Sequence, residues 1–131
     1  MNGSAHQRLH PARKRASPAV FHSPDVEDLI EFKPVDTVDF GFLLQVFVGP
    51  SDSDGEESFE VLVCTPERLL KGGQAAATGA HSVLIAAYDW SEIERCIRGV
   101  VSEVVGETWR EIALQLHDRL GRWEFADYRS R

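Results

Sequence analysis

The 131-residue sequence predicts one small α+β domain: an antiparallel sheet of about four strands, two C-terminal helices packed on it, and an ordered aromatic C-terminal tail. Segments with the period-2 hydrophobicity of strands come first, and segments with helical periodicity follow them. The chain then ends in clustered aromatic side chains, which are stable only when docked on other apolar surface. A hydrophobic content of 43% is enough to form one core.

Four segments are predicted to be strands. Residues 40–48 alternate most clearly, and residues 57–64 resume the alternation after a polar connection, which is typical of an antiparallel hairpin. Residues 19–23 form a short first strand that Pro24 ends. The continuous apolar run at 81–89 is typical of a central strand covered on both faces.

Three helix starts are visible as capping signals. Thr65 and Pro66 begin a short helix that reaches about residue 70. Capping boxes at Ser91 with Glu94 and at Thr108 with Glu111 begin two longer helices, which Gly106 separates. Their apolar stripes comprise Ile93, Ile97, Val100, Val101 and Val104, and then Trp109, Ile112, Ala113, Leu116 and Leu120.

The tail WEFADY (residues 123–128) is predicted to fold back over the sheet. We expect Trp123 and Phe125 to join the core, whereas Tyr128 suits either the core or an exposed interface anchor. Glu124 and Asp127 either remain outside or tie the tail to backbone amides or to an arginine such as Arg110.

Charge divides the chain into a basic tail and an acidic domain. Residues 1–18 carry four basic side chains and no acid, lack periodic hydrophobicity, and are predicted to be disordered; residues 19–131 form the domain and hold all 21 acids. Residues 25–39 form either one helical turn before Pro34 or an acidic loop. No apolar stretch follows the N-terminal charges as a signal peptide requires.

The acidic excess disfavours nucleic acid and favours a basic protein partner, although excess acid also simply aids solubility. The candidate partner-binding residues are Asp25, Glu27, Asp28, Glu31, Asp36, Asp39, Asp52, Asp54, Glu56, Glu57 and Tyr128. The basic segment ARKR (residues 12–15) is an alternative nucleic-acid arm, but it lacks interleaved aromatic residues. No apolar run approaches the roughly 20 residues of a membrane span.

Catalysis, cofactors and metals find little support. SDSDGEE (residues 51–57) fails as an EF-hand because its ligand positions would fall on Pro50 and Val61, and the glycines at 72–73 lack a following Gly-Lys-Ser/Thr. Cys64 with His81 or His22 imitates a thiol protease pair, but Cys64 lies within a strand. Cys64 and Cys96 are expected to be reduced and buried in a cytoplasmic protein.

Six segments together resemble the immunity protein 8 family of bacterial polymorphic toxin systems. They are HSPD (22–25), FGFLLQVFVGP (40–50), ESFEVLVCTPERLL (57–70), SVLIAAYD (82–89), GETWREIALQL (106–116) and WEFADY (123–128). The resemblance runs over residues 22–128, and WEF-x-DY and GETW are its most specific parts. Ala126 departs from it, since the family is expected to have an acid there.

The resemblance implies a small α+β protein that is encoded beside a toxin and protects its own cell by binding the toxin domain over the active site. This is similar to other acidic immunity proteins that cap basic nucleases, and it supplies no catalytic residues. The alternatives are a small hydrolase that uses Cys64 or an acid pair such as Glu56 and Glu57, and another protein-interaction module. Monomer and dimer both remain open.

Overall fold

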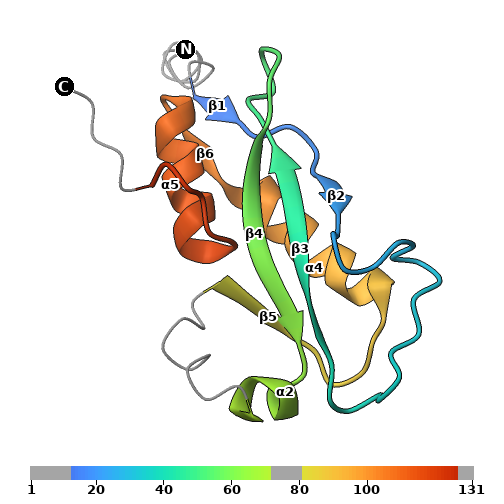
Figure 1. Ribbon diagram of the computed structural model, residues 1–131. Helices are drawn as coiled ribbons and strands as arrows, with labels where there is room; N and C mark the ends of the chain where they lie inside the picture. The colour runs from blue at the N-terminus through green and yellow to red at the C-terminus, as the bar shows by residue number, and fades with distance from the viewer. Residues whose placement is uncertain (1–12, 72–80, 127–131) are drawn as a thin grey trace, which may run out of the picture.

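The computed structural model describes residues 13–71 and 81–126 and confirms the α+β class. The strands are β1 (Lys14–Arg15), β2 (Val20–His22), β3 (Gly41–Val48), β4 (Glu57–Cys64), β5 (Ser82–Leu84) and β6 (Val105–Gly106). The helices are α2 (Pro66–Lys71), α4 (Trp90–Glu103) and α5 (Trp109–Arg119). One sheet has the order β2-β3-β4-β5, and a second pairs β1 with β6 (Figure 1).

The β3–β4 hairpin is the centre of the fold. Its eight residue pairs run from Gly41 opposite Cys64 to Val48 opposite Glu57. Burial alternates along β3, as the sequence pattern predicts. The side chains buried by this alternation are Phe42, Leu44, Val46 and Val48 on β3 and Phe59, Val61 and Val63 on β4.

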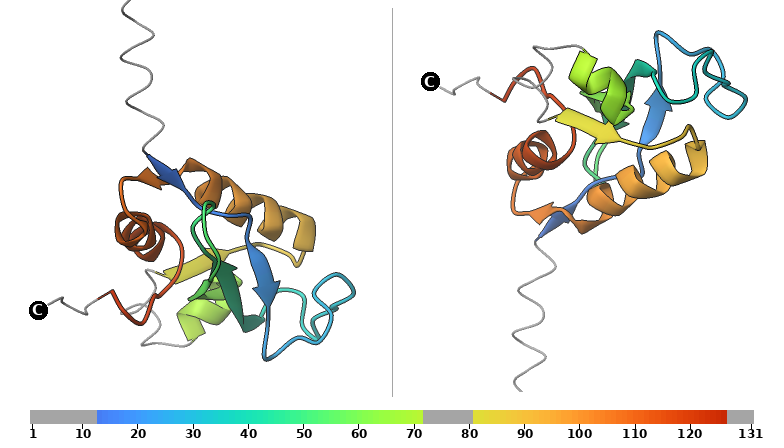
Figure 2. Two further views of the ribbon diagram at one scale, coloured as in Figure 1. Left: turned by 90° about the horizontal axis from the view of Figure 1, so that it is seen from above. Right: turned by 90° about the horizontal axis from the view of Figure 1, so that it is seen from below.

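The two longer helices cover one face of this hairpin. Ile97 of α4 and Leu116 of α5 are fully buried in the same cluster as Leu44 of β3. In Figure 1, α4 passes behind the hairpin and α5 lies beside β4. Figure 2 shows α4 side-on and α5 end-on, so the two helices run in different directions. The predicted helical stripes therefore meet the predicted strand face in a single core. No helix within 13–71 and 81–126 combines the length and apolarity needed to cross a bilayer.

Strand β5 differs from the prediction of a central antiparallel strand. It spans three residues at the edge of the sheet, pairs with β4 in parallel, and leaves Leu84 53% exposed. Helix α2 lies in the connection between β4 and β5, and such a crossover brings the chain back in the same direction. A short apolar run cannot distinguish a central strand from an edge strand, so this prediction was wrong.

Part of the segment predicted to be a disordered tail, residues 1–18, makes backbone contacts with the domain. Lys14 and Arg15 pair with β6, and the Ser17 amide donates to the Gly49 carbonyl at 2.7 Å. A two-residue strand has no periodicity to detect, so its sequence resembles that of a disordered segment. Residues 1–12 lie outside the described residues.

Capping was predicted correctly for one of the two long helices. The Thr108 hydroxyl accepts the Glu111 amide at 3.2 Å, and the Glu111 carboxylate accepts the Glu107 amide at 2.9 Å. Helix α4, however, begins two residues earlier than predicted, because Asp89 rather than Ser91 is its N-cap. Asp and Ser are equally good caps, and propensity alone does not choose between them.

The C-terminal segment returns to β4, as predicted. The backbones of Glu60 and Arg122 exchange two hydrogen bonds of 2.8 and 2.9 Å, and Trp123 stacks on Phe59 with ring centroids 6.2 Å apart. Trp123 is only 6% exposed, which confirms its predicted place in the core. Phe125 is 46% exposed, so its predicted place in the core was wrong. Asp127 and Tyr128 lie outside the described residues.

Two glycine substitutions should have opposite effects on the free energy of unfolding. A Cβ on Gly121 would lie 2.7 Å from Val61 Cγ2 and 2.8 Å from the Glu60 carbonyl oxygen, so Gly121→Ala should destabilise the protein by about 1–3 kcal/mol. A Cβ on Gly99 in α4 meets nothing within 4 Å, so Gly99→Ala should stabilise it by about 0.5–1 kcal/mol. Urea denaturation measures both; equal effects would contradict the close approach of Gly121 to β4.

Candidate functional site

Residues 24–39, here called the acidic loop, connect β2 to β3 and form neither a helix nor a strand. The irregular alternative of the sequence analysis is therefore correct. The loop backbone is fixed at its start by Ser23, whose hydroxyl donates to the Leu43 carbonyl at 2.6 Å and accepts the Asp25 and Val26 amides at 3.1 Å. The Asp25 carboxylate in turn accepts the Leu43 amide at 2.8 Å.

Tyr88 fixes the middle of the acidic loop. Its hydroxyl donates to the Leu29 carbonyl, and its ring packs edge-to-face on Phe32 with centroids 4.9 Å apart. Burial raises the pKa of Tyr88 to about 12, and the negative charges of Asp28 and Asp89 add to the effect. The phenol is therefore neutral at physiological pH, and its proton forms the hydrogen bond to the Leu29 carbonyl.

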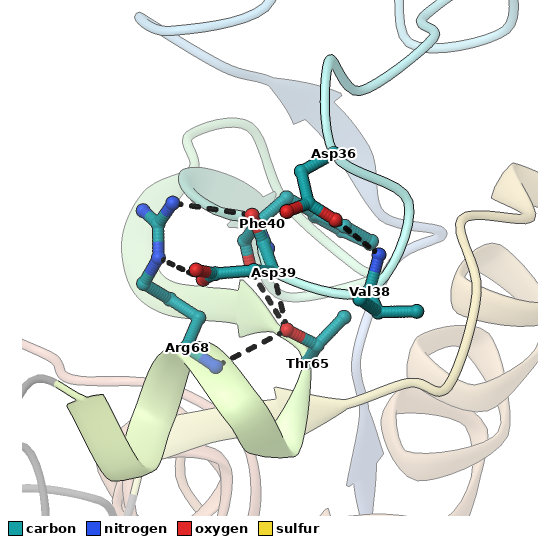
Figure 3. A network of polar contacts seen from close by, with 6 residues as sticks. All are labelled: Asp36, Val38, Asp39, Phe40, Thr65 and Arg68. Atoms are coloured by element: carbon teal, nitrogen blue, oxygen red, sulfur yellow. Dashed lines mark hydrogen bonds and ion pairs between the residues drawn. The ribbon is translucent and has the colours of Figure 1, made fainter.

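Helix α2 fixes the end of the loop (Figure 3). The Arg68 guanidinium donates to the Asp39 carboxylate at 2.7 Å and to the Asp39 carbonyl at 3.2 Å. The Thr65 hydroxyl accepts the amides of Phe40 and Arg68, each at 3.3 Å. One hydroxyl therefore joins the start of β3 to the cap of α2. Asp39, which sequence analysis groups with the partner-binding residues, therefore also makes a structural contact.

The outer surface of the acidic loop mixes apolar and acidic side chains. Ile30 is 73% exposed, Val38 is 56% exposed, and Val35 is fully exposed. Glu27, Asp28, Glu31 and Asp36 are exposed between them. Sequence analysis did not include the apolar side chains in the site. No sequence pattern marks these side chains, because they lie among acids and prolines in a segment without a sustained hydrophobic period.

The hairpin loop, residues 49–56, carries the second acidic group. It lies at the opposite end of β3 from the acidic loop, about 26 Å away for an eight-residue strand. The predicted acids therefore form two groups rather than one surface. Asp54 and Glu56 are exposed, whereas Asp52 pairs with Lys14 at 2.6 Å, a hydrogen bond that lowers the pKa of the Asp52 carboxyl.

Glu57 is directed into the protein and has a structural role. Its carboxylate accepts the indole N–H of Trp109 at 2.9 Å and also accepts the indole N–H of Trp123. Buried indoles need an acceptor, and this carboxylate serves two of them. Sequence analysis grouped Glu57 with the loop acids, because contacts between residues 52 and 66 positions apart leave no local sequence pattern.

Cys64 and the Glu56–Glu57 pair, the catalytic groups considered in the sequence analysis, lie in environments that disfavour their proposed chemistry. Cys64 is fully buried, and burial raises the pKa of its thiol, which disfavours a thiolate nucleophile. Glu56 is exposed while Glu57 binds the indoles, so the two carboxylates do not act as a pair. Within the described ranges, no three His, Cys, Asp or Glu side chains are grouped to hold a metal. Cys96 is exposed, so its predicted burial was wrong.

Comparison with known proteins gives one family match. The family model described as immunity protein 8 matches residues 19–128 of the chain. No match was found among curated proteins or among solved structures. The match covers β2 to α5 and the C-terminal segment, and it includes both the acidic loop and the hairpin loop.

Removing the Glu57 carboxylate should release the C-terminal segment. Glu57→Ala leaves two indole donors without their acceptor, which should lower the free energy of unfolding by about 2–3 kcal/mol. Glu56→Ala, one position earlier and exposed, is the matched control and should change it by less than about 0.5 kcal/mol. Urea denaturation followed by tryptophan fluorescence measures both. Equal stabilities of the two variants would contradict the double indole contact.

Tyr88→Phe keeps the ring but removes the donor to Leu29. It should cost about 1 kcal/mol and accelerate hydrogen exchange of amides in residues 27–33, with β3 amides unchanged. Because the folded pKa of Tyr88 is raised, its contribution is complete below about pH 10 and is lost as pH rises towards 12. Wild-type protein should therefore lose more stability than Tyr88→Phe over this range. Parallel pH profiles of the two proteins would contradict the assignment.

Proposed function

Because the chain belongs to the immunity protein 8 family, we propose that it binds and neutralises a cognate bacterial toxin domain in the cytoplasm of the cell that makes both. Neutralisation occurs by occlusion: an acidic surface covers the active site of the toxin. Such an inhibitor acts one-to-one and needs no catalytic group, only a complementary patch on the order of 800 Å² on each partner.

The observation that carries this proposal is the acidic loop. Its backbone is fixed at three points by Ser23, Tyr88 and Arg68, yet it exposes Ile30, Val35 and Val38. A fixed loop loses little conformational entropy when it is bound, so the contact energy is available for affinity. Exposed apolar side chains on such a loop favour a protein partner over a small molecule.

The charge of the loop favours a basic partner. Glu27 and Glu31 have no cation within ion-pair distance among the described residues, so their charge is available to a binding partner. A nuclease domain has a positive surface because it binds phosphates, and it would complement these acids. The proposed contact residues on this loop are Asp25, Glu27, Asp28, Glu31, Asp36 and Asp39.

The acids of the hairpin loop have a more distant role in this proposal. Asp52, Asp54 and Glu56 lie at the far end of β3 and raise the rate of encounter through long-range attraction. Glu57 is left out of the proposed contact, because its carboxylate already accepts two indole N–H groups. Tyr128, proposed as an additional anchor, lies outside the described residues.

Binding kinetics to the toxin domain encoded beside this gene test the proposal. Wild-type protein should form a one-to-one complex and abolish toxin activity, with association slowed by added salt. Glu27→Lys with Glu31→Lys should slow association and accelerate dissociation. Asp54→Lys with Glu56→Lys, which makes the same charge change, should slow association by up to about tenfold and leave dissociation unchanged.

Surface plasmon resonance separates the two rates, and the hairpin-loop double variant is the control for net charge. A complex in which the toxin retains full activity would refute occlusion. Faster dissociation of the hairpin-loop variant alone would move the contact to the other end of β3.

A further inference from the structure

A groove of about 940 Å³ lies between the acidic loop and the start of α4. The loop contributes Ile30, Phe32 and Thr37 to its lining, and the segment that leads into α4 contributes Tyr88, Asp89 and Trp90. Three aromatic residues, Phe32, Tyr88 and Trp90, therefore line the groove. Asp89 lies between Tyr88 and Trp90 in the sequence and also lines it. Both walls are fixed, since Tyr88 bonds to Leu29 across the base of the loop.

The two segments that form this groove carry much of the negative charge of the chain. Segments 25–39 and 86–94 contain nine of the 21 acids and one of the 14 basic residues, Lys33. Twelve acidic and thirteen basic side chains remain elsewhere, so the rest of the chain is nearly neutral. Asp39, Glu92 and Glu94 pair with arginines of this chain. The other six acids have no cationic partner among the described residues: Asp25, Glu27, Asp28, Glu31, Asp36 and Asp89.

Asp89 has capacity for a ligand. One of its carboxylate oxygens accepts the Glu92 amide as the cap of α4, at 3.4 Å, and no described donor bonds to the other oxygen. Its chain neighbours, Tyr88 and Trp90, line the groove together with it. A carboxylate beside aromatic rings is the environment that a guanidinium prefers, because its plane can stack on a ring while its N–H groups donate to the carboxylate.

One arginine of the protein itself already combines an aromatic ring with a carboxylate in this way. Arg98 of α4 lies with its guanidinium carbon 4.9 Å from the centroid of the Phe21 ring and bonds to the Glu94 carboxylate at 2.8 Å. Phe21 in turn packs edge-to-face on Trp90 at 5.1 Å. An internal arginine therefore already lies against an aromatic ring and bonds to Glu94, one of the two carboxylates that line the groove. The other lining carboxylate, Asp89, has no such partner among the described residues, and Lys33 is the one cation in the lining.

We infer that this groove receives an arginine side chain from the surface of the partner protein, with its stem against Tyr88 and Trp90 and its guanidinium at Asp89. Ile30, Val35 and Val38 then cover the apolar residues that flank that arginine. The identity of the partner as a toxin rests on the function proposed above, but the chemistry of the groove does not.

Acetyl-arginine amide is the probe that tests the groove without any toxin. In ¹⁵N-resolved NMR of the full chain, it should shift the amides of residues 30–37 and 87–91. Acetyl-citrulline amide has the same shape without the charge, and acetyl-lysine amide has the charge without the plane; each should cause shifts about five times smaller. Equal shifts with either compound, or shifts confined to the hairpin loop, would overturn the inference.

Asp89→Asn is the decisive variant because asparagine caps a helix as well as aspartate does but carries no charge. It should remove most of the arginine-induced shifts while leaving the spectrum of β3 and β4 unchanged. Asp54→Asn, the same change in the exposed hairpin loop, should bind the arginine probe like the wild type. Retained arginine shifts in Asp89→Asn would assign the binding elsewhere.

The toxin domain encoded by the adjacent gene separates this inference from the proposed function. If both hold, Asp89→Asn should bind that domain about tenfold more weakly than Asp54→Asn does. Equal, tight binding by both variants would overturn the groove assignment and leave the inhibitor proposal intact. If the wild type binds no toxin, the inhibitor proposal fails, and the arginine probe still decides what the groove accepts.

Discussion

The fold depends on one carboxylate that holds two indoles. Glu57 begins β4, Trp109 begins α5, and Trp123 lies beyond the end of α5, so a single side chain ties both ends of this helix to the central hairpin. Arg110 adds to the closure, since its guanidinium carbon lies 5.6 Å from the Trp123 ring centroid. Burial of the apolar faces brings these elements together, but it is largely non-directional. The hydrogen bonds of Glu57 specify where α5 and the C-terminal segment come to rest.

A separate set of contacts holds the surface proposed for binding. The acidic loop has no ladder of its own, and its backbone groups are bonded instead to Ser23, Tyr88 and the aspartates within it. Several acids therefore serve two purposes, because Asp25, Asp28 and Asp36 bond to nearby amides and still carry their charge. The loop can be acidic, irregular and fixed at once, which is what a preorganised protein-binding surface requires.

What the sequence predicts correctly is local or periodic. The alternation of β3 and β4, the helical stripes and the Thr108 cap each depend on neighbours within a few residues, and all three are confirmed. The errors concern contacts between distant positions. The sequence pattern does not reveal that β5 pairs in parallel at an edge, that Lys14 and Arg15 join β6, or that Glu57 is directed inward. For the site, composition identified the acids but not their separation into two groups or the apolar residues between them.

The lengths of the outer strands have a consequence for how the protein behaves at high concentration. Two eight-residue strands fill the middle of the sheet, but each of its borders, β2 and β5, is only three residues long. An open border offers unpaired backbone groups to any other extended chain, and long flat borders are the usual starting points of aggregation. A three-residue border offers few backbone groups to a second copy, which disfavours pairing along this edge. A protein proposed to accumulate in advance of its target would in this way remain dispersed.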